Sequence, residues 1–549
     1  MQIGKTIASN IFPNTIDSFW FILDPNAIVN PFDFVTVENV SNTKSIGMVQ
    51  YLRTFVTDSS SVESTYRLNT KSAIIARAAV MATTTTTNTD EKHSPNYASN
   101  ISINLPVGSE KPVRFANAEE IKLALGIPNM TEPIPAGIIE NSDGLSVPIS
   151  LDISYLLGPD TAHVNASGIS GNSKTSYLMF LLQSLYQKLK KEQFVLILFN
   201  TKDQDLLHIH EAEDESKKTS KQKSFEILDL ELKPFRNVTY FLPRGKDGKP
   251  NSLHVPEHNT KTYSYELEDV YDRLELLFSE IYDPHHNLSS IVNYVYESWP
   301  IKSKAHKKIK TWTDLYKFND YPAGIITHKS TLLYFQAHLY RFRKSALFVD
   351  KKLTSTYLGK EIKEMNSGDI FVIDMAMLPS IDEQSFIIGD VMKSINELYA
   401  ARLNAQTNYQ NKQKERNEDD QAQQKIKPKY VMIFIDEINR FVPKDRPGGK
   451  LNAVAEQIMK SLIGGRSRGT ILFSAQQFKS TVDYALHENT GTHIIAKLGL
   501  SELATFPYSS IDKHTKLNIV RLNKGELVLV HPAFRYPIRI KFPKAYFGN

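Results

Sequence analysis

The 549-residue chain contains no cysteine at all. Disulfides, thiolate zinc sites and cysteine nucleophiles are therefore excluded. No uninterrupted apolar run of about 18 residues occurs either, so no membrane span is expected. The first residues, MQIGKTIASNIF, lack the positive and then apolar pattern of a secretion signal. These absences together fit a cytoplasmic protein without a membrane segment.

An excess of charge of one sign is also missing. Lysine and arginine number 65 against 60 aspartates and glutamates, which leaves a net charge of +5. Dedicated nucleic-acid domains are usually more basic, so the total charge is weak evidence for nucleic acid. A ring that grips phosphate in a central pore needs only local positive charge. The length predicts two to four domains.

The first part of the chain predicts a small β domain. Short apolar runs with β-forming residues stand between turn residues at Phe19–Leu23, Phe34–Val37, Ile46–Tyr51 and Ala73–Ala82. The polar run TTTTTNTDEKHS that follows predicts a mobile loop. A short helix is predicted at Asn117–Leu125, before proline-rich text. We place the first domain and its linker at residues 1–130.

Beyond residue 130 strands and helices alternate, which predicts an α/β core with a mainly parallel sheet. The clearest elements are a helix at Thr175–Lys190 and apolar strands at Phe194–Phe199, Phe371–Met375, Val431–Ile435 and Thr470–Phe473. We assign residues 131–204 and 346–549 to this core. Residues 205–345 predict a helical insertion, with an amphipathic helix at Tyr265–Tyr282. The polar stretch Asn404–Lys429 predicts either a solvated helix extension or disorder.

The segment His163–Tyr177, HVNASGISGNSKTSY, has the local pattern of a phosphate-binding loop. A short apolar strand precedes a glycine-containing turn, and Lys174-Thr175 opens a helix. The usual pattern is G-x-x-x-x-G-K-[ST], and Ser173 stands here where the second glycine is expected. Taken alone, Lys174 is better explained as a solvated surface residue, but the strand before it and the amphipathic helix after it favour a phosphate-binding loop.

In the phosphate-loop interpretation, Lys174 contacts the β and γ phosphates of ATP and Thr175 binds Mg²⁺. The residues then expected to surround the nucleotide are Gly168, Ser170, Gly171, Asn172, Ser173, Lys174, Thr175 and Ser176.

A second signal is VMIFIDEINR, an apolar strand that ends in two carboxylates. In an ATPase, Asp436 holds the Mg²⁺ shell and Glu437 orients or deprotonates the attacking water. The alternative is an ordinary strand that ends in an acidic turn.

The third signal is GGRSRGTILFSAQQF. A helix at Ala453–Leu462 is expected to end at Gly464-Gly465, before Arg466, Arg468 and a strand. Gln476 at the strand's end is placed to sense the γ-phosphate, and Arg466, with Arg468 as the second choice, to act as an arginine finger on a neighbouring subunit. The alternative is arginine capping of a helix followed by an ordinary strand end.

With these motifs in this order, the chain resembles HerA, of the HerA/FtsK branch of RecA-like P-loop ATPases. The N-terminal IGKTIAS, FWFIL, FVTVEN and IGMVQYL resemble the HAS-barrel of that family, and the C-terminal LNKGELVLVHPAFRYPIRIKFP resembles its β-rich end. The resemblance covers nearly the whole chain, and the missing glycine at Ser173 is a departure from it.

The resemblance implies a homohexameric ring that hydrolyses ATP with Mg²⁺ and translocates or unwinds double-stranded DNA. It further implies a nuclease or a sirtuin-type NADase as partner, in anti-phage defence for the bacterial relatives. Two rivals stay open. One is a nucleotide-regulated scaffold that assembles and activates a partner effector, and the other is a conjugation or packaging pump of the same superfamily.

Two histidine pairs, His208 with His210 and His285 with His286, suggest a metal site. Neither pair offers three well-spaced ligands on one element, so we assign no metal besides Mg²⁺. The basic run Lys302–Lys310 is either a DNA contact or a solvated loop. No cluster of nuclease-type carboxylates stands out, so we expect any nuclease activity to belong to a partner.

Overall fold

The computed structural model describes residues 2–40, 42–56, 72–85, 104–171, 173–279, 281, 283, 285–303, 308–322, 324–325, 329–413, 428–445 and 451–548. Within these ranges, the side chains at 56, 85, 192, 215–217, 220, 402–413 and 466 are not described. The chain forms two compact units. The first contains residues 1–188, 216–232 and 490–545, and the second contains residues 189–215, 233–489 and 546–549.

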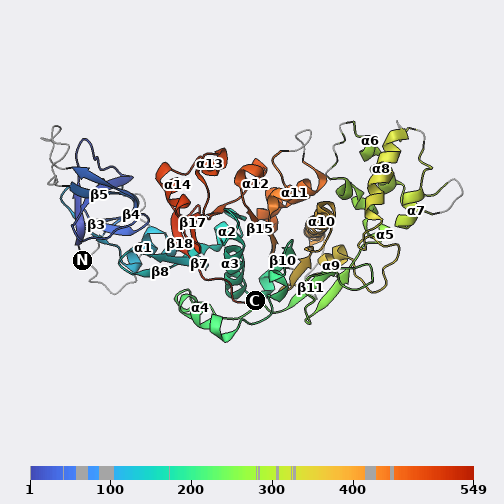
Figure 1. Ribbon diagram of the computed structural model, residues 1–549, viewed down its shortest axis with the longest axis horizontal. Coiled ribbons are helices and arrows are strands. Elements are labelled where there is room, and N and C mark those ends of the chain that lie inside the picture. The colour runs from blue at the N-terminus through green and yellow to red at the C-terminus, as the bar shows by residue number, and fades with distance from the viewer. Residues whose placement is uncertain are drawn as a thin grey trace, which may run out of the picture. The chain divides into compact units, whose positions relative to one another are not determined.

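The first unit begins with a closed antiparallel barrel, drawn in blue in Figure 1, whose strands follow the order β1-β2-β5-β4-β3-β6. The bounds are β1 Gln2–Ile7, β2 Ser18–Leu23, β3 Phe34–Glu38, β4 Thr43–Val56, β5 Ser72–Thr85 and β6 Pro112–Phe115. Inward-facing residues such as Phe19, Phe21 and Val35 fill the barrel. The predicted β domain is confirmed, although β1 and β6 were not predicted from the hydrophobic pattern. The predicted mobile loop lies outside the described residues from position 86 onward.

Helix α1 (Ala118–Ala124) is joined to the barrel strands by hydrogen bonds to a buried carboxylate, Glu120. Asn117 and Glu120 form a capping box at its start. Glu120 also accepts from Lys44 Nζ at 2.9 Å and from Arg114 Nη2 at 2.6 Å. Burial by itself would raise the pKa of Glu120, but these hydrogen bonds outweigh it and lower the pKa to about 2.

The rest of the first unit is a sheet with the strand order β9-β16-β17-β18-β7-β8. Only the pair β9 and β16 is parallel, and the other neighbours are antiparallel. The strands are β7 Pro133–Glu140, β8 Ser146–Asp152, β9 Val164–Ser167, β16 Thr492–Ile495, β17 Glu526–Val530 and β18 Ile538–Lys541. The helices are α2 Ile153–Leu156, α3 Lys174–Lys188, α4 Glu215–Ile227, α13 Leu500–Leu503 and α14 Lys513–Val520. The predicted helix that opens at the phosphate loop is therefore confirmed.

The second unit is built on a sheet in which every strand pair is parallel, in the order β12-β11-β13-β10-β14-β15. The strands are β10 Phe194–Asn200, β11 Val238–Pro243, β12 Thr260–Tyr263, β13 Ile370–Asp374, β14 Tyr430–Ile435 and β15 Thr470–Gln476. All residues of β10, β13, β14 and β15 are buried, as apolar runs in a covered parallel sheet require. The α/β class with a mainly parallel sheet is thereby confirmed.

Helices of the second unit share one hydrophobic core with this sheet. They are α5 Leu267–Val270, α6 Asn287–Glu297, α7 Trp312–Lys317, α8 Lys329–Phe342, α9 Leu358–Glu364, α10 Ile381–Gln413, α11 Ala453–Arg468 and α12 Tyr484–Glu488. Helices α5 to α8 are the predicted helical insertion (Figure 1). The range 205–345 is not helical throughout, however, because β11 and β12 extend the parallel sheet from within it.

Two helix predictions need correction. The span Tyr265–Tyr282 is not one α-helix, because α5 is followed by a 3₁₀ helix, η5, at Tyr271–Phe278. Helix α11 does not end at Gly464-Gly465 but continues to Arg468. Its cap is Gly469, which has a φ of 74° and whose added Cβ would lie 2.0 Å from the carbonyl oxygen of Lys429. Helix α10 extends to Gln413, and residues 414–427 of the polar stretch lie outside the described ranges.

Among the helices of the described residues, none combines the length and the apolar character that a membrane crossing requires.

Candidate functional site

The predicted phosphate loop lies in the first unit, between β9 and α3. Strand β9 is buried and ends at Ser167, and α3 begins at Lys174 as the pattern predicts. Gly168 has a φ of 152°, and a Cβ there would lie 2.6 Å from the Cβ of Ala496. Only glycine fits this position, because the loop passes directly over the end of β16.

The loop is fixed to the end of β16 by main-chain hydrogen bonds. The Ile169 amide donates to the Lys497 carbonyl at 3.0 Å, and the Ala496 amide donates to the Ser167 carbonyl at 2.8 Å. Ser170 and Gly171 are exposed, whereas Thr175 and Ser176 in the first turn of α3 are half-buried. Asn172 lies outside the described residues.

Ser173 adopts the conformation for which the usual motif uses glycine. Its φ is 65°, in the left-handed region, and Gly171 nearby has a φ of 78°. The carbonyl of Ser173 accepts from the Tyr177 amide at 2.9 Å, the first bond of α3. A non-glycine residue in this region costs about 1–2 kcal/mol. Serine at this position thus keeps the backbone conformation of the motif's glycine, at the cost of backbone strain.

Lys174 folds back over the loop. Its side chain is buried, and Nζ donates to the Ile169 carbonyl at 3.2 Å. A solvated surface lysine would extend into water, so this geometry favours the phosphate-loop interpretation over the alternative. The ammonium and the N-terminus of α3 add positive potential on the same side of the loop.

The two acidic residues lie in the second unit, at the carboxyl end of β14. Asp436 is buried, and its Oδ1 accepts from the Glu437 amide at 2.9 Å. Glu437 has a left-handed backbone with a φ of 52° and starts the 3₁₀ helix η6 (Ile438–Arg440). Its Oε2 lies 3.5 Å from Arg440 Nη1. The strand therefore ends in one buried and one partly exposed carboxylate.

Gln476 ends the neighbouring strand β15. Ile435 of β14 pairs with Ser474 of β15, so Asp436 and Gln476 leave adjacent strands at the same edge of the sheet. Gln476 is fully buried. The structure thus brings together the acidic pair and the glutamine that the sequence singled out, at the edge where parallel sheets usually carry their sites.

The two arginines lie on the last turn of α11. Arg468 is exposed, whereas the side chain of Arg466 is outside what the structure describes. Both are therefore helical residues rather than part of the loop that the sequence predicted. A cation at this position is favoured by the helix dipole, as in the capping alternative.

Lys202 is a site residue that the sequence did not reveal. It follows β10, which pairs with β14, and its Nζ lies 3.1 Å from Asp436 Oδ2 and 3.4 Å from Glu437 Oε1. Burial by itself would lower the pKa of Lys202, but the two carboxylates outweigh it and raise the pKa above its ordinary value. The sequence did carry one signal for Lys202, because it is a polar residue just after a buried strand. That strand, β10, pairs with the strand that ends in the two carboxylates.

A second missed group lies where β10 and β13 end side by side. Asn200 Nδ2 donates to Asp374 Oδ1 at 2.8 Å, and Ser252 hydrogen bonds to the other carboxylate oxygen. Burial raises the pKa of Asp374 despite these hydrogen bonds. The run FVIDM in the sequence placed Asp374 at a strand end, but its partners come from other segments.

Comparisons with known proteins give structural similarity only. No family model matches the chain, and no curated protein matches it. The bacterial conjugative coupling protein TrwBΔN70, in its unbound monoclinic form, aligns with a TM-score of 0.42 at 12% identity, covering 75% of this chain and 91% of that one. VirB4 of Thermoanaerobacter pseudethanolicus aligns with a TM-score of 0.42 at 14% identity, covering 76% and 97%.

A third solved structure, EssC (ATPases 2 and 3) from Geobacillus thermodenitrificans, aligns with a TM-score of 0.29 at 11% identity, covering 76% of this chain and 45% of that one. All three TM-scores lie below 0.5, so the similarity does not assign a function to this chain.

Proposed function

We propose that the chain is a P-loop ATPase that binds ATP with Mg²⁺. The observation that carries this proposal is the loop from Gly168 to Lys174, which joins a buried strand to a helix N-terminus with three residues at positive φ and a lysine folded over it. Such turns direct successive backbone amides toward one point, which is how these loops bind phosphate.

The Mg²⁺ ion would be held by hard oxygen donors. By the sequence motifs, these would be the hydroxyl of Thr175, in the first turn of α3, and the carboxylate of Asp436 at the end of β14. When bound, Mg²⁺ neutralises charge on the β and γ phosphates. Glu437 acts as the base that orients or deprotonates water, and Gln476 senses the γ-phosphate.

Arg466 is proposed to stabilise the transferred phosphoryl group in a neighbouring subunit of a ring, with Arg468 as the second choice. Their place on the last turn of α11, with Arg468 exposed, leaves this end of the helix accessible to another chain.

At the finer level, we propose a HerA-like hexamer that couples ATP hydrolysis to double-stranded DNA translocation or unwinding. Two observations support it: the order of the motifs, and the closed six-stranded barrel at the position where that family has its HAS-barrel. By the same resemblance, the partner is a nuclease or a sirtuin-type NADase, and the setting is anti-phage defence in the cytoplasm.

A second candidate is a nucleotide-regulated hexameric scaffold with little motor activity. The strained Ser173 in the phosphate loop and the small net charge favour it. ATPase rates with duplexes of increasing length separate the two, because a translocase responds to duplex length and a scaffold responds to its partner.

The first test is the pair of variants Glu437→Gln and Lys174→Ala. Removal of the base should leave nucleotide binding intact and lower turnover about 10²- to 10⁴-fold. Removal of the lysine should weaken binding and abolish turnover. Fluorescent ATP-analogue binding and phosphate release measure the two quantities, and Glu456→Gln, on the exposed face of α11, is the control. Turnover of Glu437→Gln at the parental rate would show that Glu437 is not the base.

A further inference from the structure

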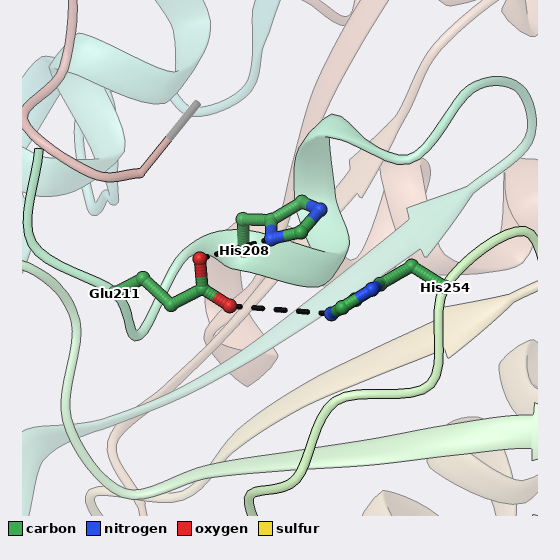
Figure 2. A group of neighbouring side chains, drawn as sticks. All are labelled: His208, Glu211 and His254. Carbon is green, nitrogen blue, oxygen red and sulfur yellow. Dashed lines mark hydrogen bonds and ion pairs between the residues drawn. The ribbon is translucent and has the colours of Figure 1, made fainter.

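A cluster of histidine and glutamate side chains lies in the second unit, apart from the acidic end of β14. Figure 2 shows its three central members, His208, Glu211 and His254. His208 is the last residue of the 3₁₀ helix η4 (Asp205–His208), which follows β10, and Glu211 lies three residues later. His254 comes from the loop between β11 and β12. The sequence pattern raised His208 but offered no third ligand, because His254 lies more than forty residues further along the chain.

The three side chains converge on one point. His208 Nδ1 lies 3.0 Å from Glu211 Oε2, and His254 Nε2 lies 4.0 Å from Glu211 Oε1. One ligand atom of each residue lies within 4.8 Å of the others. Figure 2 shows one nitrogen of each imidazole facing a different oxygen of the Glu211 carboxylate. Zinc bonds of about 2.0–2.2 Å at tetrahedral angles separate ligand atoms by about 3.3–3.5 Å. The two separations from Glu211, 3.0 Å and 4.0 Å, lie on either side of that value.

The surroundings hold these side chains in place. The ring of His208 is buried and stacks on the ring of His254, with centroids 4.1 Å apart. Ser252 Oγ lies 2.8 Å from the His254 carbonyl and also hydrogen bonds to Asp374 at the end of β13. The Gly548 amide donates to the Glu211 carbonyl at 2.9 Å. The main chain of His254 is thus linked through Ser252 to the end of β13, and the main chain of Glu211 is linked to the C-terminal segment.

A third histidine, His210, borders the carboxylate, and His258 packs behind it. His210 Nε2 lies 3.9 Å from Glu211 Oε1, and its Nδ1 lies 2.7 Å from the Tyr240 hydroxyl of β11. His258 stacks on His210 with ring centroids 5.0 Å apart. Three histidines within 4.0 Å of one glutamate exceed what a single hydrogen-bonded carboxylate requires.

We propose that His208, Glu211 and His254 form a binding site for a divalent transition metal, with Zn²⁺ as the best match. Two imidazoles and one carboxylate suit zinc, whereas Mg²⁺ and Ca²⁺ prefer oxygen ligands throughout. Glu211 and His254 are partly exposed, so water completes the coordination. The metal links the loop after β10 to the loop after β11. This site does not depend on the proposed ATPase function, since it shares no residue with it.

The test uses the full-length chain without a histidine tag. The protein is stripped with a chelator, dialysed against Zn²⁺ and analysed for metal content, and a competing chromophoric chelator gives the affinity. We expect one Zn²⁺ per chain, with affinity about 100-fold lower or worse in Glu211→Gln and in His254→Gln. His285→Gln, which removes an exposed histidine outside the cluster, should bind as the parent does.

The proposal is overturned by a stripped parent that takes up no Zn²⁺, or by variants that bind with the parental affinity. Circular dichroism establishes that each variant folds, and His254→Gln lies on a partly exposed loop, so it decides the matter if Glu211→Gln does not fold. Visible absorption of Co²⁺ in the same site gives an independent readout. An intense four-coordinate spectrum supports the site, and a weak six-coordinate spectrum contradicts it.

Discussion

Replacing Lys202 by methionine tests whether this residue competes with Mg²⁺ for the acidic strand. The Lys202 ammonium lies 3.1 Å from Asp436 Oδ2 and 3.4 Å from Glu437 Oε1. If Asp436 holds Mg²⁺ as proposed, the Lys202 ammonium and the metal ion compete for its carboxylate oxygens. The methionine variant keeps most of the length of the side chain and removes the ammonium, with its charge and its hydrogen-bond donors.

The expected size of the effect follows from geometry and exposure. Two unit charges 3.1 Å apart attract by about 5 kcal/mol at an effective dielectric constant of 20. The Lys202 side chain is 49% exposed, however, and measured values for such ion pairs are about 0–1 kcal/mol because water screens them. We take about 1 kcal/mol, since two carboxylates share the ammonium, which corresponds to about fivefold in Mg²⁺ affinity.

The pKa of Lys202 fixes the pH range of the competition. Because the pKa is raised, the ion pair persists below the ordinary lysine value and is lost only as the pH rises through the raised one. Lys202 is thus charged throughout the neutral range, and its effect on Mg²⁺ binding should not change between about pH 6.5 and 8.5.

The assay is Mg²⁺ titration of ATP hydrolysis and of ATP-analogue binding, in parent and variant. Half-saturation in Lys202→Met should fall about fivefold. The matched control is Lys261→Met, since Lys261 lies in the same unit, is 46% exposed and pairs with Glu361 at 2.8 Å. An unchanged Mg²⁺ requirement would refute the competition, and a higher requirement would show that Lys202 supports the metal site instead.

Two other outcomes are expected. Ser173→Gly relieves a left-handed backbone strain of about 1–2 kcal/mol but costs about 0.5–1 kcal/mol in the conformational entropy of glycine. Hydrogen exchange of the Tyr177 amide should therefore slow slightly in this variant, and it should not slow in Ser173→Ala. Faster exchange in the glycine variant would contradict the strain. Burial lowers the pKa of His531 in the first unit and of His487 in the second to about 4. Unfolded histidine titrates near 6.5, so stability should be complete above that pH and fall as pH drops toward 4, by up to about 3 kcal/mol per residue. His531→Gln should flatten the acid unfolding profile of the first unit only, and an unaltered profile would contradict the assignment.

Strong local patterns were enough to predict the elements that carry the proposed ATP site. Helix α3, strand β10 and strand β14 were found because each has an unambiguous apolar period or run. The span of η5 was predicted as an α-helix, since a pattern of this length does not distinguish 3.6 from 3.0 residues per turn. Arg273 within it is buried and bonded to Asp390 of α10 at 2.8 Å, a contact between segments far apart in the sequence.

The end of α11 shows why glycine alone does not locate a helix boundary. The segment GGRSRG holds three glycines, and the pattern predicted the end of the helix at the first pair, Gly464-Gly465. A tertiary contact decides the boundary, because the Cα of Gly469 lies too close to the Lys429 carbonyl for any side chain. Gly469 also has a positive φ, and its amide donates to the Gly465 carbonyl. Its carbonyl accepts from the Val431 amide at 2.7 Å, at the start of β14.

The same reasoning explains Lys202 and the histidine cluster. Both depend on which strands lie side by side, and β10 lies between β13 and β14, which follow it in sequence by more than a hundred residues. The loop after β10 therefore carries both Lys202, against the carboxylates of β14, and His208 with Glu211, against the loop after β11. A single loop thus contacts the proposed catalytic carboxylates at one end and a candidate metal site at the other. A change in Lys202→Met that leaves Zn²⁺ content untouched would show that the two ends act independently.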